Sequence, residues 1–264
     1  RPLAILGGSR WTEQARADIR AFLVANNIAT TVSFRRQSLY DGTLANYAGD
    51  LGVGSDPALV AKAKEADLIL AIGTRLGEPV SQGYTLFGAD HAAPIIHIHP
   101  EGSEIGRVSR PALGIVADVN AFAAAIRDQK VAKPGWGAWT AELRAIRMKG
   151  LAIQPYEGLN LSQVMHDLAA LMDDDAIMTC DAGNFATWPP RFINFGDQQR
   201  FIGPTNGAMG YAVPAAIGAA IGQPFDDMLA TMRGFSPSAL LGQVQTALDG
   251  IAAQAGVLDV GAVM

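Results

Sequence analysis

Short, continuous apolar runs recur along the first half of the chain, separated by segments with apolar residues at helical spacing. Such runs predict strands buried on both faces, and helices between them predict a parallel sheet. The predicted strands are Pro2–Leu6, IATTVSF, Leu68–Ile72, PIIHIHP and a short strand at LGIV. The predicted helices begin after Thr12, at Asp56–Pro57 and after Asp118. Residues 1–128 are therefore predicted to form one doubly wound domain.

The segment from 35 to 55, RRQSLYDGTLANYAGDLGVGS, interrupts this pattern. It is rich in turn-forming residues and is predicted to be a loop. Residues 129–150 are predicted to be a linker followed by a helix. We expect Trp136 and Trp139 to pack this helix onto a face of the domain.

The alternation of helix and strand starts again near residue 151. Asn160 and Gln163 resemble a capping box, and the apolar residues after them repeat at helical spacing: Val164, Leu168 and Leu171. Strands are predicted at AIMTC and RFI, and an Ala/Gly-rich helix follows. The predicted fold class is thus α/β with two doubly wound (Rossmann-like) parallel-sheet domains. The second, residues 151–224, is truncated, and residues 225–264 form a tail that continues no pattern.

Composition narrows the classes of function. The 264 residues suit two domains of ordinary size. A net charge of -5 argues against nucleic-acid binding, and no apolar run is long enough to predict a membrane span. No signal peptide is apparent, and a single cysteine, Cys180, fits a reducing cytoplasm. Because the chain begins with Arg1 and not Met, we expect a fragment or a processed piece.

Two loops follow the predicted strands of the second domain, and both are rich in glycine. One is Asp181-Ala182-Gly183-Asn184, and the other runs from Asn206 to Gly210 before the Ala/Gly-rich helix. Ligands of open parallel sheets lie beyond the carboxyl ends of the strands, and a helix N-terminus offers free N–H groups. The alternative is that the glycines serve tight packing of the helix on the sheet. The residues alone leave both readings open.

These stretches resemble a known family. DDDAIMTCDAGNFATW and FIGPTNGAMGYAVPAAIGAA resemble the start of the cofactor-binding domain of thiamine pyrophosphate (TPP) enzymes, most closely the acetolactate synthase-like group. Four earlier segments resemble the central domain of the same family in order and spacing: LAILGGS, YAGDLGVGSDPAL, ADLILAIGTRLGE and EGSEIGRV. The resemblance spans residue 1 to about residue 224.

The resemblance implies roles for five positions. Gly207 would offer its carbonyl to the 4'-amino group of the cofactor, and Ala208 lies in the same wall. Met209 would give its N–H to the pyrimidine ring, and its side chain would wedge between the two rings. Gly183 and Asn184 would contact the diphosphate. In that family the cofactor attacks the carbonyl of a 2-keto acid, and carbon dioxide leaves.

Two parts of the family's machinery do not occur in this sequence. The glutamate that activates the cofactor lies on a separate N-terminal domain of the family. Its magnesium is held by the aspartate of a Gly-Asp-Gly motif and by an asparagine further on, and this sequence lacks the motif. We therefore assign no catalytic residue and no metal ligand, although the full-length family uses Mg²⁺. The tail can be a divergent end, a helix pair or out-of-frame translation, and we favour the last.

The first domain raises a second ligand question. Flavin-binding relatives carry an acidic residue in the strand that reads IHIHP here, so FAD or ADP binding is doubtful. His97 and His99 share a face and could join a metal, but we favour two polar side chains at a strand end. Arg75 meets either a nucleotide phosphate or a surface carboxylate. Cys180 is predicted to be a buried strand residue and not a nucleophile. The only histidine of this unit that could activate it is His166, which lies on the preceding helix.

The leading hypothesis is a fragment of a TPP-dependent enzyme that acts on 2-keto acids and is inactive alone. Because the family's site lies between subunits, we expect a homo-oligomer. The alternative is a non-catalytic protein that binds an adenine nucleotide or a protein partner with the same fold. On either hypothesis we expect a cytoplasmic protein that binds neither nucleic acid nor membrane.

Overall fold

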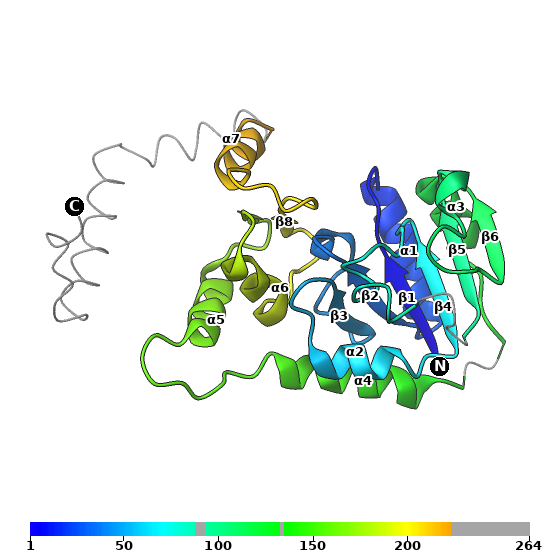
Figure 1. Cartoon of the computed structure of the whole chain (residues 1–264), viewed down its shortest axis with the longest axis horizontal. Helices are drawn as coiled ribbons and strands as arrows, with labels where there is room; N and C mark the ends of the chain where they lie inside the picture. The colour runs from blue at the N-terminus through cyan, green and yellow to red at the C-terminus, as the bar shows by residue number, and fades with distance from the viewer. Residues whose placement is uncertain (88–92, 133–134, 223–264) are drawn as a thin grey trace, which may run out of the picture. The chain divides into compact units, whose positions relative to one another are not determined.

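A computed structural model describes residues 1–87, 93–132 and 135–222 of the chain (Figure 1). Its main feature is a six-stranded parallel sheet with the strand order β3-β2-β1-β4-β5-β6. The strands are β1 Pro2–Leu6, β2 Ala29–Ser33, β3 Tyr47–Leu51, β4 Leu68–Ile72, β5 Ile95–His99 and β6 Leu113–Val116. The order reverses between β1 and β4, which makes this a doubly wound sheet, as predicted.

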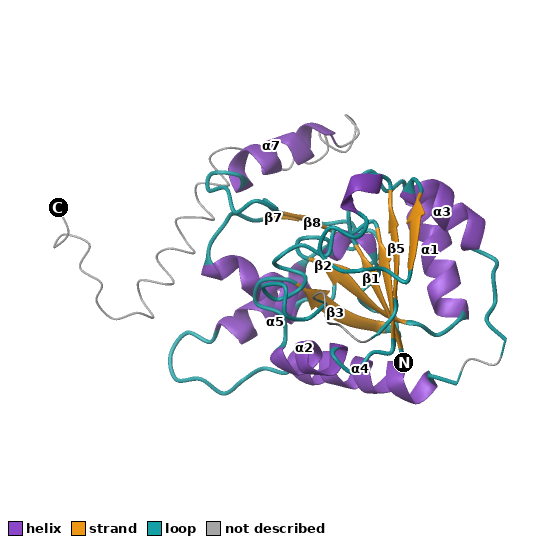
Figure 2. Cartoon of the chain, turned by 45° about the vertical axis from the view of Figure 1, so that its right-hand side comes forward, coloured by secondary structure: helices purple, strands orange, loops and turns teal. Residues whose placement is uncertain are grey.

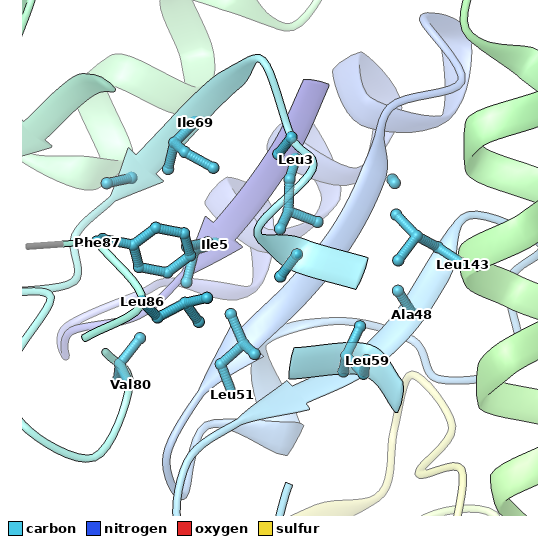
Figure 3. Close-up of a cluster of buried hydrophobic side chains, with 14 of the residues drawn as sticks. Leu3, Ile5, Ala48, Leu51, Leu59, Ile69, Val80, Leu86, Phe87 and Leu143 are labelled. Carbon is cyan, nitrogen blue, oxygen red and sulfur yellow. The ribbon is translucent and has the colours of Figure 1, made fainter. Parts of the chain in front are cut away.

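Helices cover both faces of this sheet (Figure 2). They are α1 Glu13–Ala25, α2 Pro57–Ala63, α3 Val119–Ile126 and α4 Gly137–Gly150, and two short 3-10 turns are η1 Gln37–Leu39 and η2 Gly102–Glu104. Alternate residues of β1 enter different cores. Leu3 and Ile5 pack with residues of α2 and α4, whereas Ala4 and Leu6 pack with α1 and α3. Figure 3 shows the first of these cores, with Leu59 and Leu143 supplied by the helices.

Local sequence signals account for the starts of three helices. The side chains of Thr12, Asp56 and Asp118 each accept a hydrogen bond from the first turn of the helix that follows. Trp139 also behaves as expected, because it is buried and its indole N–H donates to the carbonyl of Pro2 (2.9 Å). These predictions are confirmed.

The prediction of a loop over residues 35–55 is wrong, because that segment contains strand β3. Tyr47 and Leu51 are buried although the segment is rich in turn formers. Gly49 has a φ of +116°, and a Cβ there would lie 3.2 Å from the side chain of Leu59. The glycine lets the strand run closely under α2, so packing of this edge overrides the local preference for turns.

The second part of the chain contains a smaller sheet, in which β7 and β8 pair in parallel. Its elements are α5 Leu161–Leu171, β7 Ile177–Thr179, η3 Asn184–Thr187, α6 Trp188–Phe192, β8 Arg200–Ile202 and α7 Ala212–Gly222. Its core is small: Cys180, Ala186, Ile193, Phe195 and Phe201. Arg1–Ala215 form one compact unit, from which the chain beyond Ala215 is separate. The predicted tail at 225–264 lies outside the described residues, and the predicted domain boundaries stay a prediction.

Helix α5 departs from its prediction in one respect. Asn160 caps the helix, accepting hydrogen bonds from the N–H groups of Ser162 and Gln163. The Gln163 side chain does not return to the cap but donates to Asp167 (2.8 Å), so the reciprocal half of a capping box is absent. Of the described helices, none has the length and apolar character that a membrane crossing requires.

Candidate functional site

The two glycine-rich loops of the second part lie at one edge of the smaller sheet. Because β7 and β8 run parallel in the register Thr179↔Ile202, the loops that follow them leave the sheet side by side. A side chain of the first loop connects the two. Oδ2 of Asp181 accepts hydrogen bonds from the backbone N–H groups of Gly210 (2.9 Å) and Ala212 (3.4 Å).

The same carboxylate is an N-terminal cap for α7. Its other oxygen, Oδ1, accepts from the N–H of Ala182 (2.8 Å). The hydrogen bond from Ala182 lowers the pKa of Asp181 most, and those from Tyr211, Ala212 and Gly210 lower it further. A negative charge at this helix end also suits the helix dipole. The sequence suggested free N–H groups at this helix end, but Asp181 already accepts from the one of Ala212.

The loop from Gly207 to Met209 presents its backbone to the surroundings. Gly207 and Gly210 have φ values of +74° and +80°, and a Cβ at either would meet nothing within 4 Å. The N–H of Ala208 donates to Asn206 (3.2 Å). Within the described residues, the carbonyl of Gly207 and the N–H of Met209 form no hydrogen bond. The Met209 side chain is 87% exposed, so all three groups are open to a ligand.

Gly183 and Asn184 lie at the start of the turn η3, beside Asp181 in sequence. Gly183 has a φ of +152°, and a Cβ there would meet the ring of Phe185 at 2.5 Å, so this position requires glycine. Asn184 is exposed. The structure therefore brings the loops of all five predicted cofactor-binding positions to one edge, although their contacts with a cofactor stay a prediction.

The alternative explanation for the glycines was close packing of the small-residue helix α7 on the sheet. None of the residues of α7 is buried, and its larger apolar side chains are well exposed: Val213 70%, Ile217 56% and Ile221 70%. Because the chain from Ala216 onward belongs to a separate unit, the packing of this helix on the sheet stays a prediction. The helix is apolar on all sides, which is typical of helices that something else covers.

A residue in the turn after strand β2 supports the loop after β7. Arg35 follows β2, is only 6% exposed, and packs over the rings of Phe34 and Phe201. Its guanidinium donates to the sulfur of Cys180 and to the carbonyl of Asp181 (3.2 Å). No sequence signal links Arg35 with residues 145 positions later, so sequence reasoning missed this contact.

Cys180 is buried, as predicted, and burial raises the pKa of its thiol against the opposing effect of Arg35. His166 is engaged elsewhere, with its Nε2 2.6 Å from the carbonyl oxygen of Leu151. This pair therefore offers no activated nucleophile.

Arg147 of α4 fixes the segment between η3 and β8. The guanidinium donates to the carbonyls of Pro190 (3.1 Å), Arg191 (2.9 Å) and Ile193 (2.8 Å) and to Asn194 Oδ1 (2.9 Å). It also borders a small cleft lined by Ala48, Gly49, Asp50, Asp56, Leu59, Arg147 and Arg191. Burial raises the pKa of Asp50 in this cleft to about 6, although Arg147 opposes the shift.

The remaining candidate residues, His97, His99 and Arg75, lie in or beside the first sheet, and each pairs with another group of the protein. Nε2 of His97 lies 2.8 Å from the carbonyl oxygen of Thr74, and His99 pairs with the backbone of Glu101. Among the described residues, no three His, Cys, Asp or Glu side chains gather to hold a metal. Arg75 is exposed and lies 3.8 Å from Glu104, which is the surface ion pair foreseen as one alternative.

Comparisons with known proteins agree with this architecture. Residues 1–126 match the thiamine pyrophosphate enzyme central domain, and residues 181–234 match the C-terminal TPP binding domain of the same enzymes. The acetolactate synthase isozyme 2 large subunit of Escherichia coli is 25% identical over 87% of this chain and 41% of its own length. The large subunit of Corynebacterium glutamicum acetolactate synthase is 26% identical over 85% and 37%. The chloroplastic acetolactate synthase 1 of Nicotiana tabacum is 26% identical over 89% and 36%.

The chain thus spans about two-fifths of the length of these curated relatives. The matched regions coincide with the doubly wound sheet and with the two loops joined by Asp181. The chain belongs to the thiamine pyrophosphate enzyme family, with acetolactate synthase large subunits as its relatives.

Proposed function

We propose that this chain is part of a TPP-dependent enzyme that decarboxylates 2-keto acids and joins the product to a second carbonyl, as acetolactate synthase-like enzymes do. The observation that carries the proposal is the bond between Asp181 and Gly210, because it unites the two loops that the family match covers. Parallel strands end at this edge, where open α/β sheets bind ligands.

The residues present fit the thiamine half of the cofactor. The carbonyl of Gly207 and the N–H of Met209 have no hydrogen-bond partner among the described residues, and they are one acceptor and one donor on an exposed loop. These suit an amino group and a ring nitrogen. The exposed thioether of Met209 is a flexible, polarizable group that suits contact with two heterocyclic rings. When bound, TPP supplies the nucleophilic carbon and the electron sink for decarboxylation. The role of the loop is to bind and orient the rings.

The residues present do not fit the magnesium half. The sequence contains no Gly-Asp-Gly motif, and the described residues gather no cluster of metal-binding side chains. We therefore propose that the isolated chain is inactive in pyruvate decarboxylation. Release of carbon dioxide from pyruvate by the pure chain would contradict this.

We further propose that the active assembly is a homo-oligomer. The exposed apolar side chains of α7, among them Val213, Ile217 and Ile221, support association with another polypeptide. Sedimentation velocity over a range of concentrations tests this, and a monomer at every concentration would contradict it.

Thermal unfolding with added ligands tests the cofactor assignment. A ligand that binds the folded chain raises its Tm in proportion to the logarithm of ligand concentration above Kd. We expect TPP with Mg²⁺ to raise the Tm, and thiamine without the diphosphate to raise it less. A rise of several degrees with ADP or FAD, and none with TPP, would favour the nucleotide-binding alternative instead.

Gly207→Val provides a specific variant for this test. The φ of +74° at Gly207 disfavours a β-branched residue, so the valine would distort the loop and abolish the TPP response. The matched control is Gly77→Ala, because a Cβ at Gly77 meets nothing within 4 Å and its φ is ordinary. An unchanged TPP response in Gly207→Val would contradict the proposed contact.

A further inference from the structure

The loop from Gly207 to Gly210 has few internal constraints. Every residue from Thr205 to Gly210 is exposed, and two of them are glycines with positive φ. Within the described chain, its hydrogen bonds are the contact between Ala208 and Asn206 and the bond from Gly210 to Asp181. Asp181 is therefore the one side chain outside the loop that bonds to it, among the residues that the structure describes.

Asp181 is itself held firmly from the opposite side. The N–H of the preceding residue, Cys180, donates to the carbonyl of Ile202 (2.9 Å), which extends the pairing of β7 with β8. From a buried position, with its guanidinium over the rings of Phe34 and Phe201, Arg35 donates to the Asp181 carbonyl and to the Cys180 sulfur. The backbone of Asp181 is thus fixed to both sheets, and its carboxylate accepts hydrogen bonds from Gly210, at the end of the glycine loop, and from Ala212.

We propose that Asp181 is a positioning residue, which holds the Gly207–Met209 loop in the conformation that receives the thiamine rings. The proposal rests on the proposed function, since it deepens the role of that same loop. Asp181 acts through the N–H groups of Gly210 and Ala212 and does not itself contact the cofactor. Arg35, which follows β2, donates to the carbonyl of Asp181. The six-stranded sheet therefore also contributes to the geometry of the Gly207–Met209 loop.

Asp181 is proposed to act by restricting the backbone conformations that the Gly207–Met209 loop populates. Without Asp181, the two glycines allow the loop many backbone conformations. Only a fraction of these present the Gly207 carbonyl and the Met209 N–H together, and apparent affinity falls by that fraction. If a tenth of the molecules stay competent, TPP affinity falls about tenfold. Asparagine has one acceptor oxygen where Asp181 uses two, so it can keep the hydrogen bonds from Gly210 and Ala212 but loses the one from Ala182 and the charge.

The test uses the full chain and two readouts. ¹⁵N relaxation of the ligand-free chain measures the order of the Gly207 and Met209 amides, and a titration with TPP and Mg²⁺ measures affinity. We expect Asp181→Ala to lower the order of both amides and to weaken TPP binding about tenfold, with Asp181→Asn closer to the parent. Asp174→Ala, which removes an exposed carboxylate before β7, is the control and changes neither readout.

The outcomes separate this proposal from the proposed function. If the parent chain does not respond to TPP, the proposed function fails, and the relaxation data still decide whether Asp181 orders the loop. Equal amide order in Asp181→Ala and the parent overturns the positioning role. So does an unchanged TPP affinity in that variant. A fall in Tm with loop order and affinity unchanged would show Asp181 to be only a structural cap, and would also overturn the proposal.

Discussion

Arg147 offers a sharp test of how the first sheet holds the second part of the chain. Arg147 is 6% exposed, and its guanidinium donates four hydrogen bonds, three of them to the backbone carbonyls of residues 190, 191 and 193. Arg147→Met keeps the apolar stem and removes all four donors. The carbonyls then lose their partners in a largely buried site, which costs more than the net value of a hydrogen bond.

The expected loss in the free energy of unfolding is about 3–5 kcal/mol, because each hydrogen bond from a charged donor contributes roughly 1.5–3 kcal/mol and such terms do not add fully. For a chain of this size, a loss of 1 kcal/mol lowers the Tm by roughly 2–4 °C. The variant is therefore expected to melt roughly 10 °C below the parent. Urea unfolding followed by tryptophan fluorescence gives the free energy, and circular dichroism gives the Tm.

Lys149→Met is the matched control, since Lys149 is exposed on the same helix and loses the same charge. It is expected to change stability by less than about 0.5 kcal/mol. If Arg147→Met were as stable as Lys149→Met, the four hydrogen bonds would not hold the two parts together, and the account of this interface would be wrong.

Two further predictions concern buried polar groups near β2 and β3. Gln37 is 2% exposed and neither side-chain polar atom has a hydrogen-bond partner among the described residues, so Gln37→Met is expected to raise stability by about 1 kcal/mol in urea unfolding; a destabilised variant would contradict this. Burial raises the pKa of Asp50 from 3.8 to about 6, so the folded state favours the protonated carboxyl. The resulting contribution to the free energy of unfolding is complete below pH 4 and is lost as pH rises through 6. The loss reaches about 3 kcal/mol, and Asp50→Asn is expected to remove this part of the pH dependence; parallel stability curves for the parent and the variant between pH 4 and 7 would refute the shift.

The sequence predicts most elements of the first domain because their signals are local. Apolar runs at Pro2–Leu6 and Leu68–Ile72, and capping side chains such as Thr12, carry their information within a few residues. Strand β3 was missed for the opposite reason. Its burial depends on α2 and β2 and not on its own turn-rich sequence, and Gly49 makes sense only beside Leu59.

The sequence predicted which residues form the candidate site but not the long-range hydrogen bonds that hold them together. The resemblance to a known family located Gly183 and Gly207 on two loops, and parallel strands bring such loops together. Sequence reasoning could not find that Asp181 caps α7 or that Arg35 supports it, because these contacts join residues 31 and 146 positions apart. Hydrogen bonds of this range follow from the assembled fold and have no local pattern.

The central claim is that the Gly207–Met209 loop is a wall of a thiamine site, and the Met209 methyl group reports on it most directly. The chain has 8 methionines, so ¹³C-methyl labelling gives a simple spectrum that Met209→Leu assigns. Titration with TPP and Mg²⁺ should move the Met209 signal, because its exposed methyl would lie against aromatic rings, and should leave Met148 on α4 unmoved. A Met209 signal that stays in place at saturating TPP would contradict the account.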